Sequence, residues 1–486
     1  MTVTVAGRHD INLGTLRRVA LEGEEVRVSE PALRLMEEAH ERFQRYVAAR
    51  SDTFIYGITS GYGPSAGTHR TLAEAREVQQ RGSPWLGLSF GGEELPEYVS
   101  RAAVFAGLAP LVSGHTAAHP AWAQAVCGRL NGPLPRLPSR GLVAAGDLMP
   151  RFVLGTQMAP SLPGEGFSAG AANGAQTSNS LAGLTAIFAR RRLDVAERLF
   201  ALSAEAFAAP LDAYHPGLKP LWNDPFESAA LDALRAALEG ASGPRRPFEA
   251  PMSYRILPRQ LGRARRALAN LEDTATSGLS EVVTNPAFVR TADGRDEVAI
   301  STGGFHNSTA APAIDSVAAS WADLAALAQR HTVKLHRGPI SLLPDRLLPE
   351  GTDYTTGYST TYLEYVPNQA IEEMRRLAQP ALLTPAEIAA SEQDDVAVTA
   401  PLAYLAEREV AARFDEVLTV LAVTCSQALH VTGRPALPRL AGLLGFVRDL
   451  VPSVQSRRPL GEECGRLASA ISSAIESGQT HRLLGD

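Results

Sequence analysis

Residues 141–150 read Gly-Leu-Val-Ala-Ala-Gly-Asp-Leu-Met-Pro, and this stretch is the most informative part of the chain for its fold. Its centre is a run of three small residues, Ala144, Ala145 and Gly146, followed directly by the acidic Asp147. The middle residue of the run is alanine, which has a methyl group and no hydroxyl. A proline-rich segment precedes the stretch, so we expect it to lie in a break between helices, and loops held by rigid helices often carry chemistry.

Five further motifs follow one another in a fixed order along the chain. They are Tyr56-Gly57-Ile58-Thr59-Ser60-Gly61-Tyr62-Gly63, Asn173-Gly174-Ala175-Gln176, Met252-Ser253-Tyr254-Arg255, Ser301-Thr302-Gly303-Gly304-Phe305-His306 and Glu392-Gln393-Asp394-Asp395. Together with residues 141–150 they resemble, in sequence and in order, the landmarks of the aromatic amino acid lyases, the family of histidine and phenylalanine ammonia-lyases. The chain is identified as a divergent member of that family.

The resemblance implies a mainly α fold of the histidine ammonia-lyase type. That fold has a central bundle of long helices and a small N-terminal α/β part. We assign residues 1–140 to the N-terminal part, which carries the tyrosine loop, and residues 141–486 to the central bundle and the C-terminal helices. The resemblance also implies a homotetramer in which three subunits build each active site.

The apolar patterns of the sequence agree with a helical bundle. Residues 177–208, 313–335 and 402–431 are long and rich in apolar residues, and helices that are apolar on most sides are buried on most sides. Short strands are predicted at 2–5, 25–28 and 297–300.

One helix start can be predicted in detail from the sequence. Ser29 is a good N-cap and Pro31 fits a first helical turn. Leu33, Met36, Phe43 and Val47 then recur at helical spacing. We therefore expect an amphipathic helix to begin after Ser29.

The tripeptide at 144–146 departs from the family in the residue that matters most. In the family an Ala-Ser-Gly tripeptide cyclises into an electrophile, the methylidene-imidazolone (MIO), whose exocyclic methylene forms when the serine loses water. Ala145 stands at the place of that serine and has no hydroxyl to lose. We therefore expect no cofactor, and we interpret Ala144, Ala145, Gly146 and Asp147 as a degenerate MIO loop.

Three residues are candidates for catalysis by their match to family motifs. Tyr56 matches the tyrosine that removes the β-proton. A phenol titrates at about 10 in water and acts as a base near neutrality only where positive charge or hydrogen bonds favour the phenolate. Asn173 matches an asparagine that faces the cofactor and substrate, and its alternative role is an N-cap of the next helix. Asp394 stands where the family has a glutamate near the substrate amine; a solvated acidic helix end is its alternative.

The candidates for substrate binding come from the same motifs. Arg255 matches the arginine that grips the substrate carboxylate, a contact that suits a planar guanidinium, although an isolated arginine is more often a surface or salt-bridge residue. Met252 replaces a catalytic tyrosine, and it can pack but cannot transfer a proton. Phe90 falls near the histidine that holds an imidazole in histidine-specific members, which argues against histidine as substrate. Phe305 and Gln393 complete the set.

Three functions remain open at this point. The first is an MIO-independent carbon–nitrogen lyase that eliminates an amine, or another leaving group, from an amino-acid-derived carboxylate, as ergothionase expels trimethylamine from a histidine betaine. The second is a catalytically inactive member that binds a small carboxylate. The third is an ordinary aromatic amino acid ammonia-lyase, histidine ammonia-lyase-like, in which the loop serine has been replaced by alanine.

Composition narrows the partners and the compartment. The chain has 486 residues with 46 basic and 52 acidic side chains, a net charge of −6, which gives no reason to expect nucleic acid or an anionic membrane. Three scattered cysteines fit neither a disulfide framework nor a zinc cluster and favour a reducing cytoplasm. We expect a cytoplasmic protein with a small-molecule, amino-acid-like carboxylate as ligand and no metal.

Overall fold

The computed structural model describes residues 1–81, 91–116, 118–158, 174–291, 297–349, 351–352, 360–381 and 393–485. The chain forms two compact units, neither of which is a continuous segment. Unit 1 consists of Met1–Ile187, Leu271–Ile314 and Pro380–Leu405, and unit 2 consists of Phe188–Asn270, Asp315–Gln379 and Ala406–Asp486. The predicted boundary at residue 140 concerns sequence segments and stays a prediction.

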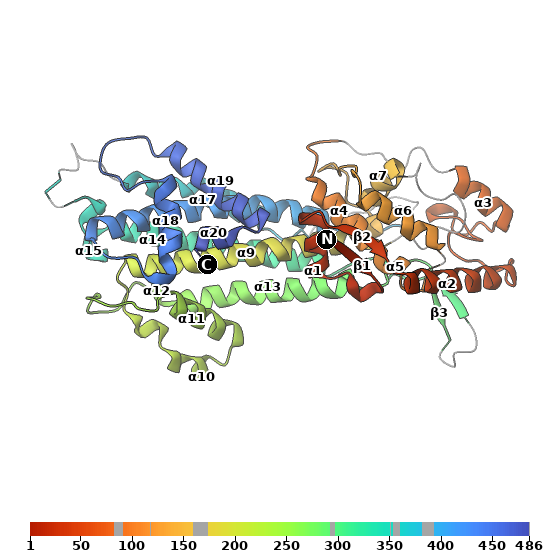
Figure 1. Ribbon diagram of the computed structural model, residues 1–486, viewed down its shortest axis with the longest axis horizontal. Coiled ribbons are helices and arrows are strands. Elements are labelled where there is room, and N and C mark those ends of the chain that lie inside the picture. The colour runs from red at the N-terminus through yellow and green to blue at the C-terminus, as the bar shows by residue number, and fades with distance from the viewer. Residues whose placement is uncertain are drawn as a thin grey trace. The chain divides into compact units, whose positions relative to one another are not determined.

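Long helices dominate the described chain, as the apolar patterns predict (Figure 1). The three predicted long helices are α9 (Gln176–Ala206), α14 (Ala310–His336) and α17 (Ala400–Thr432). A fourth, α13 (Leu257–Leu279), was not singled out from the sequence. Its charged residues are frequent enough that the apolar stripe is narrow, so it lacks the all-round apolar character that marks the other three.

The remaining α-helices among the described residues are shorter. They are α1 (Leu13–Leu16), α2 (Glu30–Ala48), α3 (Leu72–Arg81), α4 (Glu97–Ala106), α5 (Leu108–Leu111), α6 (Pro120–Leu130), α7 (Leu148–Met158), α10 (Lys219–Trp222), α11 (Pro225–Ala237), α12 (Met252–Arg255), α15 (Gly338–Ser341), α16 (Pro367–Leu377), α18 (Pro438–Leu450), α19 (Gly461–Ser477) and α20 (Thr480–Leu484). Over the described ranges, none of the helices is both long and apolar enough to cross a membrane.

The strands of unit 1 are short and paired. β1 (Thr2–Val5) and β2 (Glu25–Val28) are parallel, and β3 (Ala287–Arg290) and β4 (Glu297–Ile300) are antiparallel. The predicted strands 2–5, 25–28 and 297–300 are confirmed. β3 was not predicted, because four residues with only two large apolar side chains give too short a pattern.

Helix α2 begins as the sequence predicts. The Ser29 hydroxyl accepts a hydrogen bond from the Ala32 N–H at 3.3 Å, and Pro31 lies in the first turn. Met36 and Phe43 are buried, and the same stripe continues to the last turn of the helix. Through this buried stripe, α2 packs against the loop that follows it.

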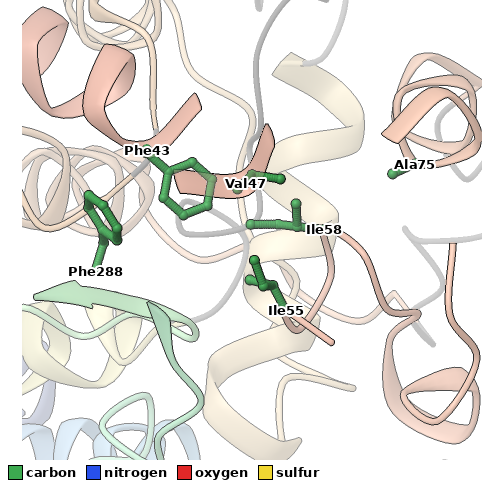
Figure 2. Packing of buried hydrophobic residues seen from close by; sticks show 6 residues of the cluster. All are labelled: Phe43, Val47, Ile55, Ile58, Ala75 and Phe288. Carbon is green, nitrogen blue, oxygen red and sulfur yellow. The ribbon is translucent and has the colours of Figure 1, made fainter. Parts of the chain in front are cut away.

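One hydrophobic cluster of unit 1 joins α2 to the loop that follows it (Figure 2). The rings of Phe43 and Phe288 meet edge to face with centroids 5.0 Å apart. Ile55 and Ile58 are 3 % and 1 % exposed and belong to the same cluster. These two isoleucines lie on either side of Tyr56 and Gly57 in sequence, so the cluster anchors the tyrosine loop both before and after this pair.

The core of unit 2 contains buried charges as well as apolar side chains. Arg192 donates two hydrogen bonds to the carboxylate of Asp415, at 2.8 and 3.1 Å, and Ser472 donates a third at 2.7 Å. The Trp321 indole donates to Glu407 at 3.0 Å, and burial raises the pKa of that carboxyl. Each charged group is therefore paired or hydrogen-bonded, as burial requires.

Candidate active site

The tyrosine loop of unit 1 is a tight turn closed by its own backbone. The N–H groups of Ile58, Thr59 and Ser60 all donate to the carbonyl of Ile55, at 3.0, 3.0 and 3.1 Å. The Ile55 N–H donates in return to the Thr59 hydroxyl at 2.8 Å. Gly57 has φ +65°, a backbone conformation that residues other than glycine rarely adopt. The turn therefore depends on glycine at 57.

The Tyr56 side chain is half-buried at the side of this turn. Its hydroxyl accepts a hydrogen bond from the Gly63 N–H at 3.5 Å, a long contact. Its ring meets the ring of Tyr62 edge to face, with centroids 5.6 Å apart and an interplanar angle of 89°. The Tyr56 hydroxyl is thus partly exposed and within reach of one backbone N–H donor, and its role as a general base stays a prediction.

The loop at 144–147 has a sharply defined backbone. Ala144 is extended, with φ −160° and ψ 175°, and its carbonyl accepts the Val398 N–H at 2.9 Å. Gly146 and Asp147 are both left-handed, with φ 51° and 54°. A Cβ atom at Gly146 would lie 2.4 Å from a ring carbon of Phe305, so this ring packs directly on the loop.

Asp147 fixes the loop to the start of α9. Its carboxylate is 1 % exposed and accepts hydrogen bonds from the Ser178 N–H at 2.7 Å and the Ser178 hydroxyl at 2.6 Å. Burial raises the pKa of the Asp147 carboxyl to about 6, against the opposing effects of Ser178 and of Arg151. The Arg151 guanidinium donates a hydrogen bond to the side-chain amide oxygen Oε1 of Gln176, and burial lowers the pKa of Arg151 to about 10.

The raised pKa of Asp147 predicts a pH-dependent stability. The folded pKa of about 6 lies above the unfolded value of about 4. The contribution of the Asp147 carboxyl to the free energy of unfolding is therefore fully present below about pH 4 and is lost as the pH rises through about 6. Two pKa units correspond to about 3 kcal/mol. Relative to Asp147→Asn, the wild-type chain is expected to lose about that much free energy of unfolding between about pH 4 and 7, measured by urea titration.

The control for this measurement is Asp52→Asn, which changes an exposed aspartate of the same unit. Its difference from the wild type should stay constant over the same pH range. A constant difference for Asp147→Asn as well would contradict the assignment of the pH dependence to the buried carboxyl.

Gln393 and Asp394 precede in sequence the isolated β-bridge between Val398 and Ala144, which holds the loop at 144–147. Gln393 is exposed and Asp394 is half-buried. Burial raises the pKa of the Asp394 carboxyl, and the neighbouring charge of Asp395 adds to the effect. Because Val398, four residues after Asp394, pairs with Ala144, the structure brings this segment towards the degenerate loop.

The Met252–Arg255 motif forms the short helix α12 in unit 2. Met252 is 64 % exposed, and the Arg255 guanidinium forms a 3.1 Å ion pair with Glu249 in which both side chains are exposed. Tyr254 is fully buried and stacks on His331 with centroids 3.7 Å apart. Tyr254 therefore points into the core of unit 2 and does not take the place of the tyrosine that Met252 replaces.

Two predicted site residues, Asn173 and Phe90, lie outside the described residues. No group of three or more His, Cys, Asp or Glu side chains is arranged to hold a metal ion in the described part of the chain. Three contributors were not predicted: Arg151, Ser178 and Tyr62. The sequence contains an indication for Arg151. It lies four residues after Asp147 at the start of an apolar helix, and opposite charges at this spacing can lie close together.

Comparison with known proteins identifies the family. The family described as aromatic amino acid lyase matches residues 11–169 and 155–449. Histidine ammonia-lyase of Symbiobacterium thermophilum is 27% identical over 505 residues, covering 97% of this chain and 97% of that protein. These matches run through all six landmark motifs.

Two solved structures show the same fold. Tyrosine aminomutase from Streptomyces globisporus superposes with a TM-score of 0.85 at 21% identity, covering 100% of this chain and 99% of that chain. Ergothionase from Treponema denticola superposes with a TM-score of 0.83 at 16% identity, covering 98% and 99%. The predicted mainly α, ammonia-lyase-type fold is thereby confirmed. The chain belongs to the aromatic amino acid lyase family.

Proposed function

We propose that the chain is an MIO-independent carbon–nitrogen lyase that eliminates an amine from an amino-acid-derived carboxylate. In this reaction Tyr56, as phenolate, takes the β-proton of the substrate. The electrons of the broken C–H bond form the double bond between Cα and Cβ. The amine leaves with the electron pair of the C–N bond, and an unsaturated acid remains. Reverse addition of an amine to that acid follows the same path.

The residues at 144–146 do not fit the family electrophile. Its methylene requires a hydroxyl that can leave as water, and Ala145 ends in a methyl group. Ala145 is 6% exposed, so the position is enclosed by protein. No step of the proposed reaction therefore passes through that group.

The observation that supports the proposal is the sharply defined shape of the loop. Asp147 is the costly part of this backbone, because residues other than glycine rarely adopt a positive φ. Asp147 and Phe305 hold this shape from both sides. A loop that had lost all function would be free to drop such a costly geometry. The presence of that geometry in this chain therefore supports our proposal that the site still binds substrate.

The absence of an electrophile restricts the substrate to one with a good leaving group. A quaternary ammonium group is suited to this role because it departs as a neutral amine and needs no proton. Ergothionase, one of the structures with this fold, is described as an ergothioneine-degrading enzyme. We therefore favour a trimethylammonium betaine as substrate and trimethylamine as leaving group.

Arg255 is the proposed clamp for the substrate carboxylate. Its ion pair with Glu249 is exposed on both sides, and exposed pairs contribute about 0–1 kcal/mol. A substrate carboxylate can displace Glu249 at that small cost and gain a bidentate contact. Asn173 is proposed to face the substrate and Asp394 to lie near the substrate amine, and Phe90, Met252, Phe305 and Gln393 are proposed to line the site. The proposed assembly is a cytoplasmic homotetramer, which joins residues of different chains in each site.

The test is to incubate the purified protein with a pool of α-amino acids and their trimethylammonium betaines, ergothioneine included. Mass spectrometry then identifies any unsaturated acid and the released amine. We expect an acid and trimethylamine from a betaine, and formation of both about 10²- to 10⁴-fold slower with Tyr56→Phe. Release of ammonia from an ordinary amino acid would contradict the proposed leaving group.

A pool that stays unchanged would overturn the lyase and favour the binding protein. Thermal shifts with each pool member then separate the two remaining cases. Stabilisation by a carboxylate in both wild type and Tyr56→Phe identifies a catalytically inactive binder, because a binder needs no base.

A further inference from the structure

The tyrosine loop contains a second phenol whose contacts mirror those of the first. The Tyr62 hydroxyl donates a hydrogen bond to the Gly57 carbonyl at 3.1 Å, and the Gly63 N–H donates to the Tyr56 hydroxyl at 3.5 Å. The side chain of each tyrosine thus binds the backbone of the residue that follows the other tyrosine. We call this pair of reciprocal contacts the tyrosine clasp.

The clasp is tightly packed on the side of Gly57. A Cβ atom at Gly57 would lie 2.3 Å from a ring carbon of Tyr62, so the ring lies directly over the glycine backbone. The same ring meets Tyr56 edge to face at 5.6 Å, an arrangement that favours a fixed mutual orientation. Tyr62 therefore touches both the Tyr56 ring and the backbone that carries it.

The hydrophobic cluster completes the support from the other side. Ile55 and Ile58 are buried and anchor the residues before and after the Tyr56–Gly57 pair. These two anchors fix the backbone, but neither determines where the phenol of Tyr56 lies. The position of the Tyr56 phenol therefore depends on the contacts of the tyrosine clasp.

We infer that Tyr62 is a positioning residue that holds the Tyr56 phenol in place for proton removal. The inference rests on the proposed role of Tyr56 as base. Its observations are the reciprocal hydrogen bonds of the two phenols and the close packing of the Tyr62 ring on Gly57.

The test compares Tyr62→Phe with Tyr46→Phe. Both remove one hydroxyl and keep the ring, and Tyr46 packs on the cluster that anchors the loop without belonging to the clasp. The first readout is hydrogen–deuterium exchange of the peptide spanning residues 55–63, which needs no substrate. The second is the separate effect on kcat and KM for the substrate found in the pool.

Tyr62→Phe is expected to speed exchange in residues 55–63 and to lower kcat by about three- to tenfold, the range of one neutral hydrogen bond. KM should stay within about a factor of two, because the substrate contacts are untouched. Tyr46→Phe should change neither readout. Unchanged exchange in Tyr62→Phe, or faster exchange with an unchanged kcat, would overturn the inference.

The two readouts also separate this inference from the proposed function. A wild-type protein that turns over no pool member refutes the lyase, and the exchange experiment then still decides whether Tyr62 holds the loop. Turnover that depends on Tyr56 but not on Tyr62 supports the lyase and refutes the clasp as a positioning device.

Discussion

Tyr56→Phe is expected to lower kcat by about 10²- to 10⁴-fold, the contribution of a general base. The phenylalanine ring keeps the edge-to-face contact with Tyr62 and loses only the long hydrogen bond from the Gly63 N–H. The variant should therefore fold normally and bind substrate with little change in affinity. The measurement is the initial rate of unsaturated-acid formation, with isothermal titration of the same substrate.

The control is Tyr46→Phe, which should retain full activity. Its hydroxyl lies outside the clasp, and its ring packs on the hydrophobic cluster. A Tyr56→Phe rate within about tenfold of the wild type would assign proton removal to another group. A loss of substrate binding in Tyr56→Phe would instead make the tyrosine a binding residue.

Arg192→Met is expected to lower the free energy of unfolding by about 3–5 kcal/mol, the cost of breaking a buried ion pair. The Arg192 side chain is 7% exposed and the Asp415 side chain 0%. Methionine fills the space of the arginine stem but leaves the buried Asp415 carboxyl without its ion-pair partner, with the Ser472 hydroxyl still bound. The loss is measured from urea unfolding at one fixed protein concentration, since an oligomer would make stability depend on concentration.

The matched control is Arg375→Met, the same substitution at an exposed pair of unit 2. Arg375 lies 3.2 Å from Glu372, and their side chains are 68% and 66% exposed. Such pairs contribute about 0–1 kcal/mol, so the midpoint should barely move. Equal losses in the two variants would show that burial of the Arg192–Asp415 pair carries no special cost.

Local signals in the sequence predicted local structure well. Ser29 and Pro31 set the start of α2 because capping acts over a few residues. Three short strands and three long helices followed from their own periodicity. β3 and α13 did not, since one is too short for a clear period and the other too charged to look buried.

Contacts between distant segments could not be predicted from the sequence. The Ala144 carbonyl pairs with Val398, and nothing in either segment encodes the other. The direction of Tyr254 depends on its stacking with His331, which is far along the chain. For the same reason the motif positions of the candidate site followed from the family resemblance, whereas the partners of Asp147 and Tyr62 required the three-dimensional structure.

The loop at 144–147 separates its shape from its chemistry. The backbone conformation is maintained by glycine at 146, by the buried Asp147 carboxylate and by the Phe305 ring. The side chain of residue 145 takes no part in any of these contacts. A change between a hydroxyl and a hydrogen atom at position 145 therefore leaves these three supports of the loop untouched, so the backbone needs no rebuilding around it.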